Sequence, residues 1–182
     1  SGYYDYRSGY CPEFPNSSSF KGVTVHPQKW DQSLDYTDKK IVIIGSGATA
    51  VTLVPTLAEK AQKVIMLQRS PTYILNLPSK DVVANFLKRI LPSSAAHHIS
   101  RWKNILLSIG LYNASRKWPV TMAQFLKKQI RKTLKDKYQE AHFSPKYAPW
   151  DQRLCLVPDN DLFRAIKNGK AEIVTDTIKS FV

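Results

Sequence analysis

The chain has 182 residues, an apolar fraction of 43% and a formal charge of +13, a size and composition that suit one globular domain with an insertion. It has no run of about 18 apolar residues, which excludes a membrane-spanning helix, and no apolar stretch near the start that would predict a signal peptide. Two cysteines, Cys11 and Cys155, are too few for a disulfide framework or a metal site, so we expect reduced thiols in a cytoplasmic protein.

The first 38 residues show little periodicity and many turn-forming residues, among them Pro12, Pro15, Gly22 and Pro27. Aromatic residues recur through this segment, so it can pack against a neighbouring part of the protein. We therefore predict that residues 1–38 form a loop-rich segment that links domains.

A strand, a glycine turn, a helix and a second strand are predicted between residues 41 and 68. Ile41–Ile44 is a β-branched run typical of a strand buried on both faces of a parallel sheet. Residues 48–61 place Val51, Val54 and Leu57 on one face of a helix, and residues 63–68 read as another buried strand. These elements predict a right-handed βαβ unit.

The rest of the chain extends this unit. The segments expected in chain order are a loop at 69–79, helices at 80–91, 94–117 and 121–141, an aromatic loop at 143–153, a strand at 154–157, a helix at 159–168 and a strand at 172–175. We therefore predict an α/β fold, a Rossmann-like parallel sheet with a three-helix insertion at about 80–141, within a nucleotide-binding domain that spans residues 39–182.

The predicted insertion is strongly basic, since residues 81–140 contain twelve Lys and Arg against three acidic residues. Such a surface attracts anions of several kinds, including nucleic acid, acidic lipid, a nucleotide phosphate and the acidic face of a partner. Aromatic residues such as Trp102 and Tyr112 intersperse the charge, as in single-strand binders. Because charged helical faces are usually only solvated, we expect no nucleic-acid partner.

The turn after the first strand reads Gly45-Ser46-Gly47-Ala48-Thr49-Ala50 and fits the dinucleotide-binding pattern GxGxxA. The first glycine permits the tight turn, the second lets the backbone approach a pyrophosphate, and the small third residue lets the helix lie close to the strand. Free N–H groups at the helix start favour the bound anion. A purely structural turn is the alternative, but the flanking strand and helix favour a nucleotide site.

Gln68-Arg69-Ser70 follows the second strand, where NAD and FAD sites usually carry Asp or Glu. No carboxylate occurs between residues 60 and 80, so nothing there repels a 2′-phosphate. Arg69 can donate charge-assisted bonds to that phosphate, with Ser70 or Thr72 as hydroxyl donors. The pattern predicts NADP(H) rather than NAD(H), the alternative being that Arg69 is a solvated surface charge.

Residues 20–31 (FKGVTVHPQKWD) fit the pattern FxGxxxHxxxWD in full. This stretch resembles the signature of Baeyer–Villiger monooxygenases and has the same place just before the second Rossmann turn. Related flavin monooxygenases and N-hydroxylases carry Ser after the His and Tyr in place of the Trp. Pro27 and Trp30 stand at those positions, which favours the Baeyer–Villiger branch.

The resemblance implies roles for several residues. Arg69 and Ser70 lie in QRSP (68–71), similar to the family's stretch that meets the NADP phosphate. Arg153 corresponds to an Arg that lies over the flavin, stabilises the anionic peroxyflavin and positions the nicotinamide; His26 corresponds to a His that couples domain movement to catalysis. Residue chemistry alone would instead assign Arg153 to an ion pair and His26 to packing.

Two positions depart from the family pattern. Gln152 stands where better-known members have a Lys that contacts phosphate, and Thr52 stands where many members have Gln in the glycine helix. The contacts that these two residues make with the cofactor are therefore expected to differ from those of better-known members.

By the resemblance, the parent enzyme uses NADP(H) and FAD to insert one oxygen atom of O₂ into a ketone through a C4a-peroxyflavin. Oxygenation of sulfur or nitrogen in the substrate is one alternative, and an NADP-binding module with no turnover of its own is another. No GxGxxG with a following acidic residue occurs before Gly45, so we expect the FAD-binding domain to lie elsewhere in the same polypeptide. The chain alone is then expected to be inactive.

Overall fold

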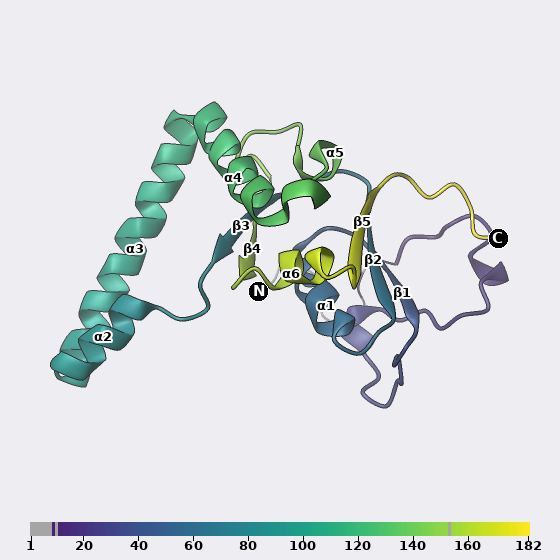
Figure 1. Ribbon diagram of the computed structural model, residues 1–182, viewed down its shortest axis with the longest axis horizontal. Helices are drawn as coiled ribbons and strands as arrows, with labels where there is room; N and C mark the ends of the chain where they lie inside the picture. The colour runs from purple at the N-terminus through teal and green to yellow at the C-terminus, as the bar shows by residue number, and fades with distance from the viewer. Residues whose placement is uncertain (1–8, 10, 153) are drawn as a thin grey trace.

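The computed structural model of the protein describes residue 9, residues 11–152 and residues 154–182, and Figure 1 shows their arrangement. The described residues form two short parallel sheets, with helices around them. Within the described residues, none of the helices has the length and the apolar character that crossing a membrane requires.

The first sheet contains β1 (Lys40–Ile44), β2 (Lys63–Gln68) and β5 (Ala171–Thr175), all parallel and in the order β1-β2-β5. Helices α1 (Ala48–Ala58) and α6 (Asp161–Lys167) pack against the face that carries the core. The predicted βαβ unit is confirmed, and the α/β fold is confirmed with it.

The prediction that the first strand is buried on both faces is wrong, because β1 is covered on one face only. Val42 and Ile44 are 57% and 50% exposed, whereas Ile41 and Ile43 between them pack against the core. The side chains of a strand alternate between the two faces of a sheet, and α1 and α6 cover only one face of this one. A run of β-branched residues therefore does not reveal how many faces are covered.

The second sheet pairs β3 (Tyr73–Leu77) with β4 (Leu154–Pro158) in parallel. The prediction of a loop over residues 69–79 is therefore wrong for residues 73–77, which form a strand. Tyr73, Ile74 and Leu75 are buried, because β4 pairs with them on one side and α4 packs against them. The flanking prolines and serines hid a five-residue strand.

Three helices lie between these two strands, as predicted: α2 (Val82–Ile90), α3 (Ser93–Lys117) and α4 (Pro119–Leu134). The third ends earlier than expected, because Lys135 takes a positive φ of 52° and the chain continues as the short elements η3 (Lys135–Lys137) and α5 (Glu140–Phe143). The turn stacks Tyr138 on Phe143, which is buried beside Phe163 of α6. Figure 1 shows α2 and α3 projecting from the rest of the molecule.

The segment before β1 contains only two short 3₁₀ turns among its described residues, η1 (Ser17–Ser19) and η2 (Pro27–Lys29). Trp30 and Tyr36 contact each other edge to face, with ring centroids 6.2 Å apart, and both pack against the core. These aromatic contacts hold the segment against the first sheet.

Candidate cofactor-binding site

The glycine turn joins β1 to α1 at the carboxyl end of the first sheet. Gly45 has a φ of +129°, a conformation that L side chains rarely adopt, and its N–H donates to Leu67 O at 2.8 Å. Ser46 is buried, and its hydroxyl donates to Ser70 O at 3.3 Å. The turn is therefore fixed to the end of β2 by one bond from each of two successive residues.

The start of α1 is open toward solvent and has no side-chain cap. Gly47 is the N-cap residue with an ordinary φ of −77°, and a Cβ added to it would meet no atom within 4 Å. Ala48 and Thr49 are exposed, whereas Ala50 is buried where the helix packs on the sheet. The uncapped N–H groups and the open approach fit an anionic group such as a diphosphate.

Arg69 and Ser70 lie at the same edge of the sheet as the glycine turn. β1 and β2 are parallel with Ile44 opposite Leu67, so the residues that follow each strand are neighbours, and the Ser46–Ser70 bond joins them directly. Both side chains are exposed, and none of the ion pairs of the described residues involves Arg69. The structure thus brings the predicted turn and the predicted phosphate contacts together.

Thr52 lies one turn into α1 and is exposed, but its hydroxyl donates to Ala48 O at 2.9 Å. A hydroxyl that donates to a carbonyl of its own helix does not donate to a ligand at the same time. The structure therefore places Thr52 next to the turn without directing its hydroxyl to it.

The aromatic loop before β4 reaches the same edge. The Tyr147 hydroxyl lies 3.0 Å from Thr72 Oγ1, and its ring meets Tyr73 edge to face at 5.4 Å. These contacts hold the loop beside the end of β2, with Gln152 exposed at its end. Arg153, the predicted flavin-facing residue, lies outside the described residues.

His26 lies in the segment before the domain and is half-buried. Its Nδ1 accepts the N–H of Gln28 at 3.3 Å and so caps η2. A Cβ added to Gly9 would collide with the imidazole ring, so the two residues lie in close contact. The hydrogen bonds described for His26 stay within its own turn and do not reach the glycine turn.

Comparison with known proteins agrees with this geometry. Residues 1–105 match the family described as flavin-binding monooxygenase-like. The chain belongs to this family. It is 54% identical over 183 aligned positions to the FAD-containing monooxygenase EthA of Mycobacterium tuberculosis and 50% identical over 182 to the probable FAD-binding monooxygenase AlmA of Acinetobacter baylyi. Both alignments cover all of this chain, but only 37% and 36% of those proteins.

Solved structures share the fold of this flavin-binding monooxygenase-like chain. An oxidized steroid monooxygenase bound to NADP superposes with a TM-score of 0.67 at 20% identity, covering 92% of this chain and 39% of that one. A cyclohexanone monooxygenase from Rhodococcus sp. Phi1 bound to NADP⁺ gives 0.65 at 15% identity, covering 92% and 38%. The resemblance to flavin-dependent monooxygenases is thereby confirmed, for a chain that spans little more than a third of its relatives.

A polar cluster around the buried Gln68 side chain, behind the site, was not predicted from the sequence. The Gln68 side chain is 2% exposed, and its Nε2 donates to Thr175 Oγ1 at 2.8 Å and to His142 O at 2.9 Å. His142 Nδ1 lies 2.8 Å from the same Thr175 hydroxyl, and burial lowers the pKa of the imidazole. This Gln68–His142–Thr175 cluster joins β2, α5 and β5 directly behind Arg69.

The sequence did contain a signal for this cluster. Val64, Met66 and Gln68 alternate toward the core, so the inward position at the end of β2 is occupied by an amide instead of an apolar side chain. A polar residue at such a position predicts buried hydrogen bonds, because an unpaired amide there costs several kcal/mol.

Proposed function

We propose that this chain is the NADP(H)-binding part of an FAD-dependent monooxygenase. The observation that carries the proposal is the juxtaposition at one sheet edge of an open glycine turn and an exposed Arg69 that takes part in none of the ion pairs of the described residues. No carboxylate between residues 60 and 80 competes with a 2′-phosphate for that guanidinium. The division into a linker at residues 1–38 and a domain at 39–182 with its helical insert belongs to the same proposal.

Each part of the edge has a distinct task in this proposal. Gly45 gives the chain its sharp turn, and the backbone N–H groups from Gly47 onward hold the diphosphate. Arg69 and Ser70 bind the 2′-phosphate, Arg69 through two parallel N–H groups. Gln68 positions Arg69 by fixing the end of β2 through its bonds to Thr175 and His142 O.

The aromatic loop and the linker complete the assignment. Gln152 lies beside the NADP phosphates as a neutral donor, and Arg153 follows it as the group that faces the flavin and steadies negative charge there. His26 is a positioning residue that transmits movement of the linker rather than a proton donor. When bound, NADPH supplies a hydride and FAD supplies the reactivity toward O₂.

The reaction that we propose is insertion of one oxygen atom into a ketone. The support is the full match of residues 20–31, with Pro27 and Trp30 at the positions that distinguish the Baeyer–Villiger signature. Oxygenation of sulfur or nitrogen is the second candidate, because the relatives' names specify only a monooxygenase. The FAD-binding domain of the same polypeptide is the partner, and the chain without it binds NADP(H) with no turnover.

Calorimetric titration with NADP⁺ and NAD⁺ tests the cofactor assignment. We expect NADP⁺ to bind more tightly than NAD⁺, and Arg69→Ala to weaken NADP⁺ binding by roughly 10- to 150-fold, as loss of a charged hydrogen bond does. Arg101→Ala removes an exposed Arg from α3 and should change neither affinity. Equal affinity of the wild type for both nucleotides would overturn the assignment.

A parallel titration with FAD tests the division of labour. If residues 39–182 form only the NADP(H) site, the chain alone binds no stoichiometric flavin. One FAD bound per chain would contradict the placement of the flavin site outside these residues.

A further inference from the structure

Helices α2 and α3 form a hairpin that contributes almost nothing to the core. α2 contains no buried residue, and the 25-residue α3 buries only Ala96 and Ser115. At the usual rise per residue α3 is about 37 Å long. Figure 1 shows both helices projecting away from the two sheets, so this α2–α3 hairpin is not held in place by a core of its own.

The α2–α3 hairpin nevertheless carries large apolar side chains in ordered stripes. Ile99, Trp102, Leu106 and Ile109 follow one face of α3 at helical spacing and are 48–62% exposed. Val83, Phe86 and Ile90 recur every three or four residues along α2 and are 49–59% exposed. Surface apolar residues are common singly, but a contiguous stripe of this kind marks an interaction surface.

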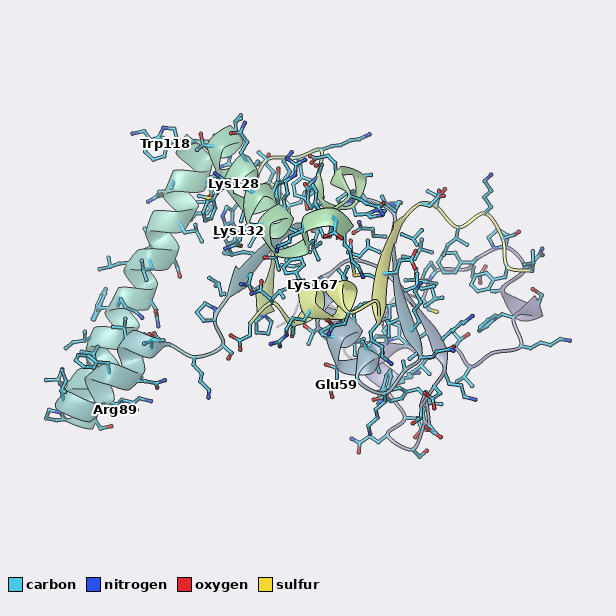
Figure 2. The ribbon with its side chains drawn as sticks, in the orientation of Figure 1. Glu59, Arg89, Trp118, Lys128, Lys132 and Lys167 are labelled. Carbon is cyan, nitrogen blue, oxygen red and sulfur yellow. The ribbon has the colours of Figure 1, made fainter. Side chains whose placement is uncertain are left out.

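The charge of the hairpin has one sign only. Residues 82–117 contain six Lys and Arg and no Asp or Glu. In the hairpin, Lys103 pairs with Asp81 and Arg116 with Asp151, but among the described residues no ion pair involves Lys88, Arg89 or Arg101. Figure 2 shows Arg89 at the far end of the hairpin, away from the sheets.

We propose that the α2–α3 hairpin binds the surface of an anionic lipid bilayer. The apolar stripes enter the boundary between headgroups and acyl chains, and Lys88, Arg89 and Arg101 contact the lipid phosphates. Trp102 suits this boundary, because an indole ring is apolar with one polar N–H. This surface is separate from the glycine turn and Arg69, and it adds membrane attachment to the proposed function.

Charge complementarity selects lipid over the other occupants. A second copy of the hairpin would bring six positive charges against six, with no acidic residue in residues 82–117 to compensate. Nucleic acid would satisfy the basic residues but has no use for exposed Ile99, Leu106 and Ile109. An anionic bilayer is the partner that takes both the apolar stripes and the positive charge.

Vesicle flotation with the protein as the cell produces it tests the proposal. We expect it to float with phosphatidylcholine vesicles that contain phosphatidylglycerol and to remain behind with phosphatidylcholine alone, and added salt should reduce flotation. No flotation with the anionic vesicles would overturn the proposal. A hairpin covered by another part of the polypeptide would give this result and would equally overturn it.

Matched triple variants locate the surface. Lys88→Gln, Arg89→Gln and Arg101→Gln together should weaken binding to the anionic vesicles roughly a hundredfold. The control removes the same charge from α4 and α6 with Lys128→Gln, Lys132→Gln and Lys167→Gln, residues that Figure 2 shows away from the hairpin tip. An equal effect of both triples would contradict a site on the hairpin.

The apolar contribution has its own readout. Binding should shift the Trp fluorescence to shorter wavelength, and Trp102→Phe should remove most of the shift while Trp30→Phe leaves it, because Trp30 packs against the core. Preferential binding to a single-stranded oligonucleotide, or salt-independent self-association in sedimentation, would overturn the assignment in favour of nucleic acid or a second copy.

Discussion

The α1 helix and the α3 helix both carry apolar stripes at helical spacing, yet they use them in opposite ways. Val51, Val54 and Leu57 of α1 are at most 3% exposed and pack into the core. Ile99, Trp102 and Leu106 of α3 are about half exposed or more. The glycine turn is thus built on a packed scaffold, whereas α3 leaves its apolar stripe exposed. Periodicity indicates a helix with an apolar face, but it does not reveal what that face meets.

Truncation of one large side chain in each region should give the largest difference in the free energy of unfolding. Phe163 is 1% exposed and packs beside Phe143, so Phe163→Ala should lower the free energy of unfolding by about 3–5 kcal/mol. Leu106 is 62% exposed, and Leu106→Ala should change the free energy of unfolding by less than about 0.5 kcal/mol. Urea unfolding measures both, and comparable losses would show that α3 is packed after all.

Two glycines separate the stability of the turn from its binding. Gly45→Ala should cost about 1–3 kcal/mol of unfolding free energy, because φ at +129° strains any side chain. Gly47→Ala should leave stability nearly unchanged, since its φ is ordinary and its Cβ would meet open space. It should still weaken NADP⁺ binding roughly tenfold, the equivalent of about 1.4 kcal/mol, by filling the approach. Unchanged NADP⁺ affinity in Gly47→Ala would contradict the diphosphate placement.

The half-buried His142 should make the stability of the core depend on pH. Burial lowers its pKa, and the charge of Glu172 acts in the opposite direction without reversing the shift, so the unfolded chain takes up the proton at a higher pH than the folded one. Stability should therefore be full above about pH 6.5 and decline as the pH falls below it. Thermal unfolding between about pH 7.5 and pH 5.5 measures this decline.

Substitutions in the two regions check the origin of that decline. His142→Asn should flatten it, since Asn keeps a polar atom near Thr175 Oγ1, whereas His98→Asn on the exposed face of α3 should not. Glu140 titrates in a separate and lower window, because hydrogen bonds from Ser144, Lys127 and Tyr138 lower its pKa to about 2. A decline that survives His142→Asn would assign it to other groups.

The smallest effect is expected at the base of the hairpin. Asp81 is the N-cap of α2 and accepts the Ala84 N–H at 2.9 Å. Its carboxylate also accepts a hydrogen bond from Lys103 of α3 at 2.5 Å. The bond from Lys103 is the main reason that the pKa of Asp81 is lowered to about 2. Asp81→Ala should speed amide exchange in residues 82–90 roughly fivefold, as loss of a helix cap does. Exchange in residues 48–58 should stay unchanged, and a change there would show that hairpin and core unfold together.

The sequence predicted the arrangement of the glycine turn and Arg69 well, because its elements are local. Gly45–Ala50 and Arg69 are fixed by a strand, a turn and a helix within 30 residues, and the parallel pairing of β1 with β2 then brings them together. The Gln68–His142–Thr175 cluster depends on contacts across 74 and 107 positions, so local patterns do not predict its partners.

Other features were missed for the same reason. β3 forms because β4, some 80 residues later, pairs with it, and its own five residues carry too weak a pattern. The early end of α4 follows from the burial of Phe143 against Phe163, with no Gly or Pro at Lys135 to announce it. The exposure of Val42 and Ile44, like that of the α3 stripe, depends on what covers a face.

Hydrogen exchange with and without NADP⁺ tests the contrast between the two regions most directly. If the glycine turn and Arg69 bind the nucleotide on a packed scaffold, protection should rise in residues 45–52 and 68–72 and stay constant in residues 82–117. Protection that rises in the hairpin while the turn is unaffected would contradict the account.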